Sequence, residues 1–523
     1  MQREPMIERL RAGETFDVLV IGGGATGLGA AVEAATRGYR TALIERDDFA
    51  KGTSSRATKL VHGGVRYLKQ GNVALVRGAL RERGRLLKNA PHLTRNLSFV
   101  IPAYSRWERF FYGTGLGVYD WLAGALSLGP SRRLGRAETL RLLPALNAAG
   151  VTGGVVYHDG QFDDARLAVN LAQTAAEHGA VVVNGCACVG LEKEGGRVVG
   201  VRVRDRESGA EWVVRAKTVI NATGVFVDEL RRVDDATARP LVTASQGAHV
   251  VLPRRFFAGE AALMVPKTED GRVLFIVPWH DCVIVGTTDT PVAKAVAEPR
   301  ALDEERAFVM EHARRYLAEK PGDGDVLSVF AGLRPLVKTA GGAGGRTASL
   351  SRDHTILASG SGLITITGGK WTTYRKMGED VINQAEQLAG WPVRTSVTAE
   401  LKIHGWTERV GAGVYGADAD GVAALARERP ELAERIHAAL GYTRAEVVWH
   451  ARHEMARTVE DVLARRTRAL LLDARASIEA APVVAGLLAG ELGRDAAWEA
   501  AQVAEYTTLA RGYVFTDPAS RGA

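Results

Sequence analysis

A glycine-rich turn near the start of the chain carries the clearest chemistry in the sequence. Gly22, Gly24 and Gly27 follow an apolar run, and a second apolar run ends at Glu45. In a dinucleotide-binding βαβ unit, such glycines permit a tight turn after the strand, a close approach of the backbone to a pyrophosphate and close packing of the helix on the strands. The N-terminus of that helix faces the phosphates. A carboxylate after the second strand binds ribose hydroxyls and disfavours a 2′-phosphate. The stretch therefore predicts FAD or NAD rather than NADP, the alternative being a tight turn in an ordinary α/β protein.

The elements that position this turn belong to a chain large enough for two or three domains. It has 523 residues, of which 46% are hydrophobic and 24% charged, as in soluble globular proteins. Three cysteines, Cys186, Cys188 and Cys282, argue against a disulfide framework or an iron–sulfur cluster and for a reducing compartment. The net charge of +7 suits anionic partners, and residues 1–17 lack the apolar core of a signal peptide.

Hydrophobic periodicity changes along the chain. Short alternating runs over 241–290 predict antiparallel strands, whereas the composition beyond 401 shifts to alanine, arginine and glutamate and predicts helices to about residue 511. We expect this tail to be a separate all-α domain. Apolar residues recur every three to four positions over 447–463, which predicts one face of a single helix. His450, His453 and Glu454 lie in that run, where contacts between helices are favoured over metal ligation.

Nine motifs follow one another in an order typical of a known family. They are GGGATGLG (22–29), TKLVHGGVRYLK (58–69), FDDARL (162–167), NATG (221–224), GAHVV (247–251), GTTDT (286–290), AGLRPL (331–336), SRDH (351–354) and GGKWTTYRKM (368–377). With HARHEMARTVEDVLARRTR (450–468), they make the chain resemble the FAD-dependent, quinone-linked glycerol-3-phosphate dehydrogenases. These enzymes belong to the wider D-amino-acid-oxidase-like flavoprotein group. The resemblance covers about residues 14–510.

The resemblance implies an α/β FAD-binding Rossmann-like domain with an antiparallel β-sheet substrate cap, and an all-α C-terminal domain. The oxidoreductase region would span 14–400 and the helical domain 401–523. Within the first region, the FAD-binding segments are expected over 14–90, 151–240 and 330–390. The substrate cap is expected over 91–150 and 241–329.

The family pattern also implies which residues hold FAD. They are Gly22, Gly23, Gly24, Gly27, Glu45, Arg46, Ser54, Ser55, Lys59, Ala222, Thr223, Gly224, Gly369, Lys370, Trp371, Thr372 and Thr373. The last five open a predicted helix, whose N-terminus would stabilise the negative charge of a reduced flavin. No metal is expected.

The implied substrate is sn-glycerol 3-phosphate, oxidised at C2 to dihydroxyacetone phosphate. A phosphate dianion favours forked, permanently charged donors, and the implied substrate-binding residues are Arg66, Tyr67, His249, Arg334, Arg352 and Lys370. His249 is the expected base, because a neutral imidazole accepts a proton near pH 7; a buried structural histidine is the alternative. Arg334 or Lys370 would stabilise the developing alkoxide, which completes the catalytic set.

An aromatic stretch suggests where the electrons go. Residues 110–130 are apolar with Asp120 as their only charge, yet they contain too many glycines for a lipid-exposed span. Aromatic side chains there lie between pairs of arginines, Arg106 with Arg109 and Arg132 with Arg133. Such a pattern favours the surface of an anionic membrane, and a cap-domain core segment is the alternative. The resemblance implies a membrane quinone as acceptor and a cytoplasmic protein bound peripherally to the inner face of the cell membrane.

Three rival functions stay open. One is a soluble glycerol-3-phosphate oxidase that uses oxygen, and another is an amine or amino-acid oxidase of the same superfamily. The third is a basic binder of nucleic acid or lipid without catalysis. Scattered rather than clustered lysines and arginines argue against it, so no nucleic-acid partner is expected. The oligomeric state is also open, with a homodimer as one alternative.

Overall fold

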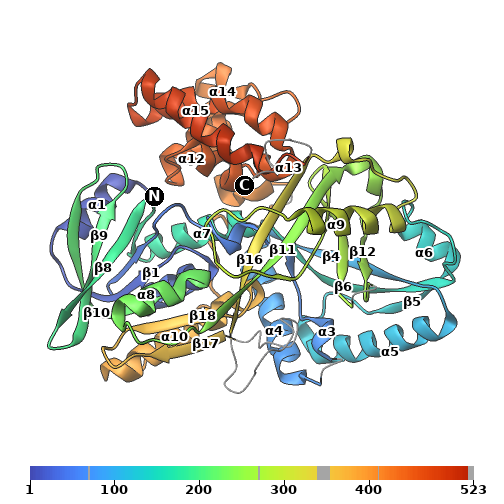
Figure 1. The fold of residues 1–523 in the computed structure, drawn as a ribbon, viewed down its shortest axis with the longest axis horizontal. Coiled ribbons are helices and arrows are strands. Elements are labelled where there is room, and N and C mark those ends of the chain that lie inside the picture. The colour runs from blue at the N-terminus through green and yellow to red at the C-terminus, as the bar shows by residue number, and fades with distance from the viewer. Residues whose placement is uncertain (69–70, 269–270, 338–353, 410, 516–523) are drawn as a thin grey trace.

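Two β-sheets organise the chain, and the first is parallel at its centre (Figure 1). The computed structural model describes residues 1–68, 71–268, 271–337, 354–409 and 411–515, apart from the side chain of Arg66. The strand order of the first sheet is β17-β18-β10-β1-β2-β7. The strands on this path are β1 (Phe16–Ile21), β2 (Thr41–Ile44), β7 (Val181–Val183), β10 (Glu211–Asn221), β17 (His354–Ala358) and β18 (Ile364–Gly368). Two more strands complete the sheet, because β9 (Arg197–Asp205) pairs with β10 and β8 (Cys186–Glu194) pairs with β9.

Both faces of this sheet are covered at its centre, which explains why β1, β2 and β7 are almost entirely apolar. Along β1, Val18 and Val20 pack on one face, whereas Leu19 and Ile21 pack on the other, because successive side chains of a strand point in opposite directions. The first face carries α2 (Ala25–Thr36), α7 (Asp164–Glu177) and α10 (Tyr374–Ala389). The second face carries α1 (Arg3–Arg11), β8 and β9, while α8 (Val227–Asp234) follows β10.

The second sheet is larger and mostly antiparallel. Its main path is β15-β11-β14-β13-β12-β4-β6-β3, with β16 paired to β11 and β5 paired to β6. Its strands are β3 (Leu60–Val61), β4 (Thr94–Ala103), β5 (Arg132–Gly135), β6 (Gly153–Phe162), β11 (Val242–Pro253), β12 (Ala262–Val265), β13 (Leu274–Trp279), β14 (Cys282–Gly286), β15 (Thr290–Pro291) and β16 (Ser328–Val337). The sequence places β6 and most of β16 with the FAD-binding segments, but both strands pair within this sheet. Strands buried on both faces carry no local signal that tells one sheet from the other.

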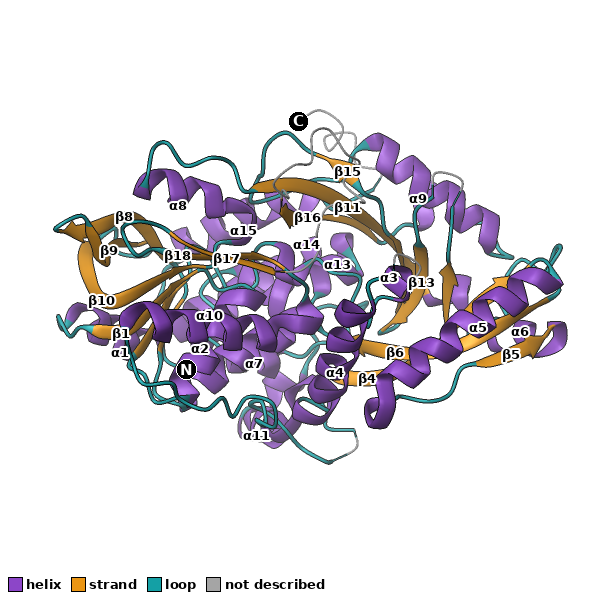
Figure 2. Cartoon of the chain, turned by 90° about the horizontal axis from the view of Figure 1, so that it is seen from below, coloured by secondary structure: helices purple, strands orange, loops and turns teal. Residues whose placement is uncertain are grey.

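Helices pack on both sides of the second sheet. One side carries α3 (Val65–Leu68), α4 (Val73–Asn89) and α5 (Arg106–Ala123). The other side carries α6 (Arg136–Leu142) and α9 (Asp303–Tyr316). Figure 2 shows α5 lying along β5 and β6 at the outer end of the molecule, remote from the first sheet.

The C-terminal region is helical, and it shares a core with the second sheet. Its helices are α11 (Ala419–Glu428), α12 (Arg444–His453), α13 (Ala469–Leu472), α14 (Ala474–Leu492) and α15 (Ala496–Arg511), with a π-helix over Asp461–Arg466. In Figure 1 these helices, coloured orange to red, lie above the junction of the two sheets. Trp279, Ile284 and Phe330 of the sheet belong to the same apolar cluster as Val462 and Val484. The C-terminal helices therefore bury one face of β11, β13, β14 and β16.

The prediction of a single helix over 447–463 is wrong. α12 ends at His453, Met455 adopts a left-handed conformation with φ of 56°, and the π-helix begins only at Asp461. The Asp461 carboxylate accepts the N–H groups of Arg457 and Thr458, at 2.9 and 3.0 Å. A side chain thus satisfies backbone donors at the start of the new element, and the apolar spacing continues across the break.

Candidate cofactor and substrate site

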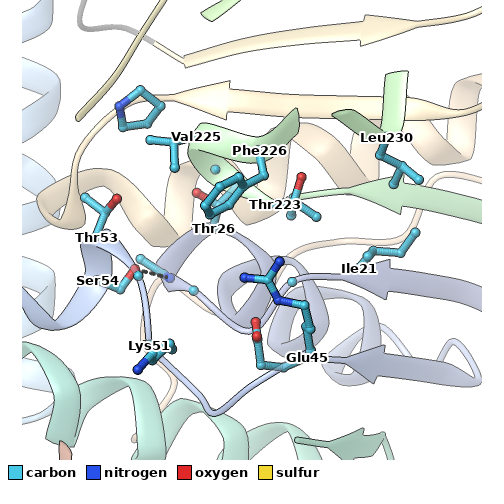
Figure 3. Close-up of a pocket in the computed structure, with 18 of the residues that line it drawn as sticks. Ile21, Thr26, Glu45, Lys51, Thr53, Ser54, Thr223, Val225, Phe226 and Leu230 are labelled. Carbon is cyan, nitrogen blue, oxygen red and sulfur yellow. Dashed lines mark hydrogen bonds between the residues drawn. The ribbon is translucent and has the colours of Figure 1, made fainter. Parts of the chain in front are cut away.

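A cavity of about 370 Å³ opens where the central strands of the first sheet end. Ile21 ends β1, Ile44 ends β2, and Ala222 follows β10; all three line the cavity (Figure 3). Ligands of open α/β sheets bind at the carboxyl ends of parallel strands, so the topology places a ligand site here.

The glycine turn has the geometry that its residue types predict. Gly22 has φ of +113°, which L side chains rarely adopt, and a Cβ at Gly27 would lie 1.9 Å from the Gly22 carbonyl oxygen. α2 begins at Ala25 directly after the turn, and the Ala25 N–H donates to Ser54 Oγ at 2.9 Å. The N-terminus of α2 therefore lies at the cavity wall, where its N–H groups suit a pyrophosphate.

Glu45 stands beside this helix end. Its two carboxylate oxygens accept the N–H groups of Gly23 at 2.7 Å and Asp47 at 2.8 Å. Burial raises the pKa of the Glu45 carboxyl to about 7, against the two N–H groups, which favour the charged form. A partly buried carboxyl after β2, beside the N-terminus of α2, matches the ribose and pyrophosphate of a dinucleotide.

The opposite wall comes from the turn after β18. Gly369, Lys370 and Trp371 line the cavity, and the Trp371 indole N–H donates to the Ser54 carbonyl at 2.8 Å. Thr372 Oγ1 accepts the His62 N–H at 3.2 Å, so this turn is joined to the loop before α3. A short 3₁₀ turn over Trp371–Thr373 leads into α10.

A second cavity, of about 630 Å³, lies on the other side of β16. Pro335 lines the first cavity and Arg334 the second, because neighbouring side chains of a strand point to opposite faces. Lys370 Nζ lies 4.1 Å from the ring centre of Tyr67, which lines the second cavity. The two cavities thus meet around β16 and the turn after β18.

Polar and apolar side chains share the wall of the second cavity. Arg334 donates to Thr287 Oγ1 at 3.0 Å and to an Asp289 carboxylate oxygen at 3.3 Å. The polar lining residues include Thr58, His62, Tyr67, Asp159, Arg272, Thr287, Thr288, Asp289 and Arg334, and the apolar ones include Phe99, Met264, Val273 and Phe275. A small anionic substrate would meet a guanidinium that hydrogen bonds already hold in place.

His249 lies one hydrogen bond behind this wall. Its Nε2 is 2.9 Å from Thr58 Oγ1, which lines the cavity, and its ring stacks on Phe330 at 4.7 Å. The residue is 2% exposed, and burial, together with Arg334 and Lys59, lowers the pKa of His249 well below its usual value. The imidazole is therefore neutral at pH 7, and the Thr58 hydroxyl connects it to the cavity.

Comparison with known proteins decides the family. The profile described as "FAD dependent oxidoreductase" matches residues 17–375, and that described as "C-terminal domain of alpha-glycerophosphate oxidase" matches residues 365–499. The human protein named "Glycerol-3-phosphate dehydrogenase, mitochondrial" is 40% identical over 98% of this chain and 75% of its own length. A probable mitochondrial glycerol-3-phosphate dehydrogenase of Caenorhabditis elegans is 39% identical, over 97% and 75%. The chain belongs to the glycerol-3-phosphate dehydrogenase family.

Solved structures agree with this family membership. The glycerol-3-phosphate dehydrogenase of Bacillus halodurans, complexed with FAD, superposes with a TM-score of 0.80 at 29% identity, covering 98% of this chain and 97% of its own. The FAD-bound L-alpha-glycerophosphate oxidase of Mycoplasma pneumoniae shares the fold, with a TM-score of 0.58 at 19% identity. FAD is the cofactor of this glycerol-3-phosphate dehydrogenase family member, and the residues of the first cavity fit its ribose and pyrophosphate.

Most of the residues expected at FAD line the first cavity of this family member. They are Gly22, Gly24, Glu45, Arg46, Ser54, Ala222, Thr223, Gly224, Gly369, Lys370 and Trp371. The expected residues that do not line it include Gly23, Gly27, Ser55, Thr372 and Thr373. Lys59 is placed elsewhere, because it is fully buried and donates to Asp164 and to the Ser55 carbonyl, both at 2.8 Å. An expected cofactor contact is thus an internal ion pair, and its partner lies too far along the chain for the sequence to reveal it.

The structure also adds wall residues that sequence reasoning missed. For the first cavity they include Lys51, Thr53, Val189, Phe226, Glu229 and Leu230, and Figure 3 shows several of them opposite Glu45. Lys51 and Thr53 lie within three positions of the predicted Ser54, so their proximity was a usable signal. Val189 and Phe226 come from apolar stretches of β8 and the turn before α8, which offer none.

Two expected substrate residues of the dehydrogenase fold are not placed. Arg352 lies outside the described residues, and only the backbone of Arg66, within α3, is described. The C-terminal histidine cluster lies between helices, as expected. Glu454 forms a forked pair with Arg166 of α7, at 2.5 and 2.7 Å, and His450 Nε2 lies 2.8 Å from the Tyr415 hydroxyl.

The aromatic stretch forms α5, with one face buried and one exposed. Leu116 and Tyr119 are buried, whereas Trp107 is 69% and Trp121 79% exposed. Phe110 and Phe111 are also exposed, and the Arg133 guanidinium lies 5.2 Å from the ring centre of Phe110. Within the described ranges, no helix has the length and hydrophobicity to cross a bilayer.

Proposed function

We propose that this protein oxidises sn-glycerol 3-phosphate to dihydroxyacetone phosphate and passes the electrons through FAD to a membrane quinone. The observation that carries the proposal is the placement of Arg334 and Pro335 on opposite faces of β16. A cation-lined cavity thereby adjoins the cofactor cavity. Relatives that are about 40% identical bear the name glycerol-3-phosphate dehydrogenase, which supports the choice of substrate.

Arg334 and Lys370 are the described cations best placed for a phosphorylated alcohol. Arg334 presents a forked guanidinium that Thr287 and Asp289 orient, and such a fork matches phosphate oxygens. Lys370 stands at the boundary of the two cavities, beside Tyr67. One of the two cations binds the phosphate, and the other stabilises the charge that develops on the C2 oxygen. Arg66 and Arg352 are proposed as further phosphate ligands.

The bound flavin supplies the acceptor for a hydride that leaves C2. As the hydride leaves, the C2 hydroxyl loses its proton and the C2–O bond becomes a carbonyl. Neutral His249 takes that proton through the Thr58 hydroxyl, which lines the cavity and lies 2.9 Å from its Nε2. Burial, with Arg334 and Lys59, lowers the pKa of His249, so the imidazole is neutral at the start of the reaction.

An anaerobic absorbance spectrum tests the first half of this proposal. Adding glycerol 3-phosphate to the purified, flavin-loaded protein should bleach the oxidised flavin band. An unchanged yellow spectrum would overturn the substrate, and a screen of amines and amino acids would then test the rival oxidase activity.

The proposal that a membrane quinone accepts the electrons rests on α5. Four exposed aromatic side chains project from this helix, namely Trp107, Phe110, Phe111 and Trp121, and arginines flank them. This composition suits the headgroup region of an anionic lipid surface and a peripheral protein on the inner face of the cell membrane. Turnover with a soluble quinone analogue, without peroxide release, is the expected result. Oxygen consumption with peroxide release would favour the soluble oxidase instead.

A further inference from the structure

The segment between β2 and β3 forms one wall of the first cavity, and its position depends on a few contacts. Lys51, Gly52, Thr53 and Ser54 line the cavity. Within this segment, Ser54 Oγ accepts the N–H that opens α2 at 2.9 Å (Figure 3). The Ser54 carbonyl accepts the Trp371 indole N–H at 2.8 Å. The segment therefore joins the pyrophosphate end of the cavity to the turn after β18.

The C-terminal domain holds this segment from behind. Asp48 is 1% exposed, and both Arg465 and Arg466 donate to its carboxylate, with Arg466 Nη2 3.0 Å from Oδ1. Arg468 Nη2 donates to the Ser55 carbonyl at 2.7 Å.

A fourth C-terminal residue reaches the wall itself. Glu460 forms an ion pair with Lys51, whose Nζ also lies 3.2 Å from Glu298. We call Arg465, Arg466, Arg468 and Glu460 the clamp. Its four residues lie within nine consecutive positions at and after the break in the C-terminal helices.

The clamp residues lie on irregular backbone, and the side chains of Arg465 and Arg466 converge on one carboxylate, that of Asp48. Here both residues end a π-helix, whose wider turn is often found at functional sites. Arg468 follows with a left-handed φ of 65°. The local geometry is costly for a side chain other than glycine, which indicates that the surrounding contacts fix it.

We propose that the C-terminal domain serves as a cofactor clamp, in which Arg465, Arg466, Arg468 and Glu460 hold residues 48–55 in the conformation that binds FAD. The buried charges hold one another in place: although burial opposes ionisation, Arg466 and Arg465 keep the pKa of Asp48 at about 2. Removing one partner leaves an uncompensated buried charge, so the segment leaves its position. FAD binding must then return the segment to its binding conformation. The apparent dissociation constant for FAD rises as the fraction of protein in that conformation falls.

The clamp concerns cofactor retention, not substrate or acceptor, and it rests on the first cavity holding FAD. The test is a titration of full-length, flavin-free protein with FAD, followed by flavin fluorescence. Asp48→Asn removes the carboxylate from the segment, and Arg466→Met removes its partner from the C-terminal side. Both variants should bind FAD about tenfold or more weakly. Should Arg466→Met not fold, Arg466→Lys, which keeps the charge and loses the forked bond, takes its place.

Glu454→Gln is the matched control. It also removes a carboxylate from a buried ion pair between the two domains, the pair with Arg166. Arg466 donates to the backbone carbonyl of Glu454, which the substitution retains, and the Glu454 carboxylate has no hydrogen bond to the described residues 48–55. We expect it to lower the thermal stability of the flavin-free protein and to leave the FAD dissociation constant unchanged.

Equal weakening of FAD binding in the control and the clamp variants would overturn the proposal, as would unchanged binding in either Asp48→Asn or Arg466→Met. The unaltered protein tests the cavity separately, because its failure to bind FAD would refute the cofactor site and not the clamp.

Discussion

The exposed tryptophans of α5 allow a quantitative test of membrane binding. Trp107 is 69% exposed and Trp121 is 79% exposed. An aromatic side chain buries about 200 Å², so the two together offer about 300 Å² to a lipid surface. At about 25 cal/mol per Å² this area corresponds to about 7 kcal/mol if it is fully buried. Since rings at the headgroup boundary are partly hydrated, we take half of this value, about 3 to 4 kcal/mol.

The double variant Trp107→Ser/Trp121→Ser should therefore bind anionic vesicles on the order of 100-fold more weakly than the unaltered protein. Cosedimentation with vesicles at low salt measures this affinity. Adding salt should weaken binding further, because Arg106, Arg109 and Arg133 near the aromatic face attract anionic lipid at about 1 kcal/mol each. Both tryptophans are largely exposed, so the fold should tolerate the change.

Val393→Ser is the control for a general loss of surface hydrophobicity. Val393 is 84% exposed in the segment after α10, outside α5, and its substitution should not alter vesicle binding. If the double tryptophan variant sediments with vesicles as well as the unaltered protein does, α5 is not the membrane-binding surface.

Four further outcomes follow from the structure. His249→Ala should slow flavin reduction by glycerol 3-phosphate about 100-fold or more with little change in substrate affinity; stopped-flow kinetics measure both, and an unchanged rate would remove His249 as the base. Thr58→Val should slow the same step because it breaks the 2.9 Å contact with Nε2, whereas Thr58→Ser should preserve it; equal rates would exclude a role for the hydroxyl. Although burial opposes protonation of His404, Asp418 and Glu177 raise its pKa to about 9. The stabilising effect of His404 is thus fully present below about pH 6.5 and lost as the pH rises through about 9. The unfolding free energy of His404→Gln should therefore fall less over this pH range than that of the unaltered protein. Parallel pH profiles of the two proteins would contradict the pairing. Glu454→Gln should lower the free energy of unfolding by about 3 to 5 kcal/mol, as measured by denaturant unfolding. Although burial opposes the charge, Arg166 and His450 lower the pKa of Glu454 to about 2. The loss of stability should therefore appear above about pH 4.5 and vanish as the pH falls through about 2.

The parts of the site that are local in sequence could be predicted, and the parts that depend on distant contacts could not. The glycine turn and Glu45 lie within one βαβ unit, and Gly22, Gly27 and Glu45 have the geometry that their residue types require. Lys59 has a buried partner, Asp164, more than a hundred positions away. A basic residue beside small hydroxyl residues predicts a contact with an anionic ligand. Nothing in the neighbouring sequence shows that the Lys59 ammonium group is already paired with the Asp164 carboxylate.

The elements follow the same rule. The antiparallel cap and the helical tail follow from periodicity, but the break at Met455 does not, because a methionine with φ of 56° leaves no mark in the apolar spacing. The assignment of β6 to the second sheet depends on pairing with β4, which is a property of the assembled fold. His249 was expected near the substrate from its place on a cap strand. The Thr58 hydroxyl that hydrogen-bonds to it lies in the connection between β2 and β3, far from His249 in the sequence, so the sequence did not predict this contact.

The clamp joins the two ends of the chain, and this has a consequence for biosynthesis. The segment over 48–55 is made early, whereas Arg465, Arg466 and Arg468 follow it by more than 400 positions. Domains generally form in the order of synthesis, so the nucleotide turn exists well before the residues that fix its neighbouring wall. Tight flavin binding would then wait until residues 460–468 have been made. A product terminated before them would hold flavin more weakly, with the segment over 48–55 loosely held and accessible to proteases, and quality control would have a direct means of recognising it.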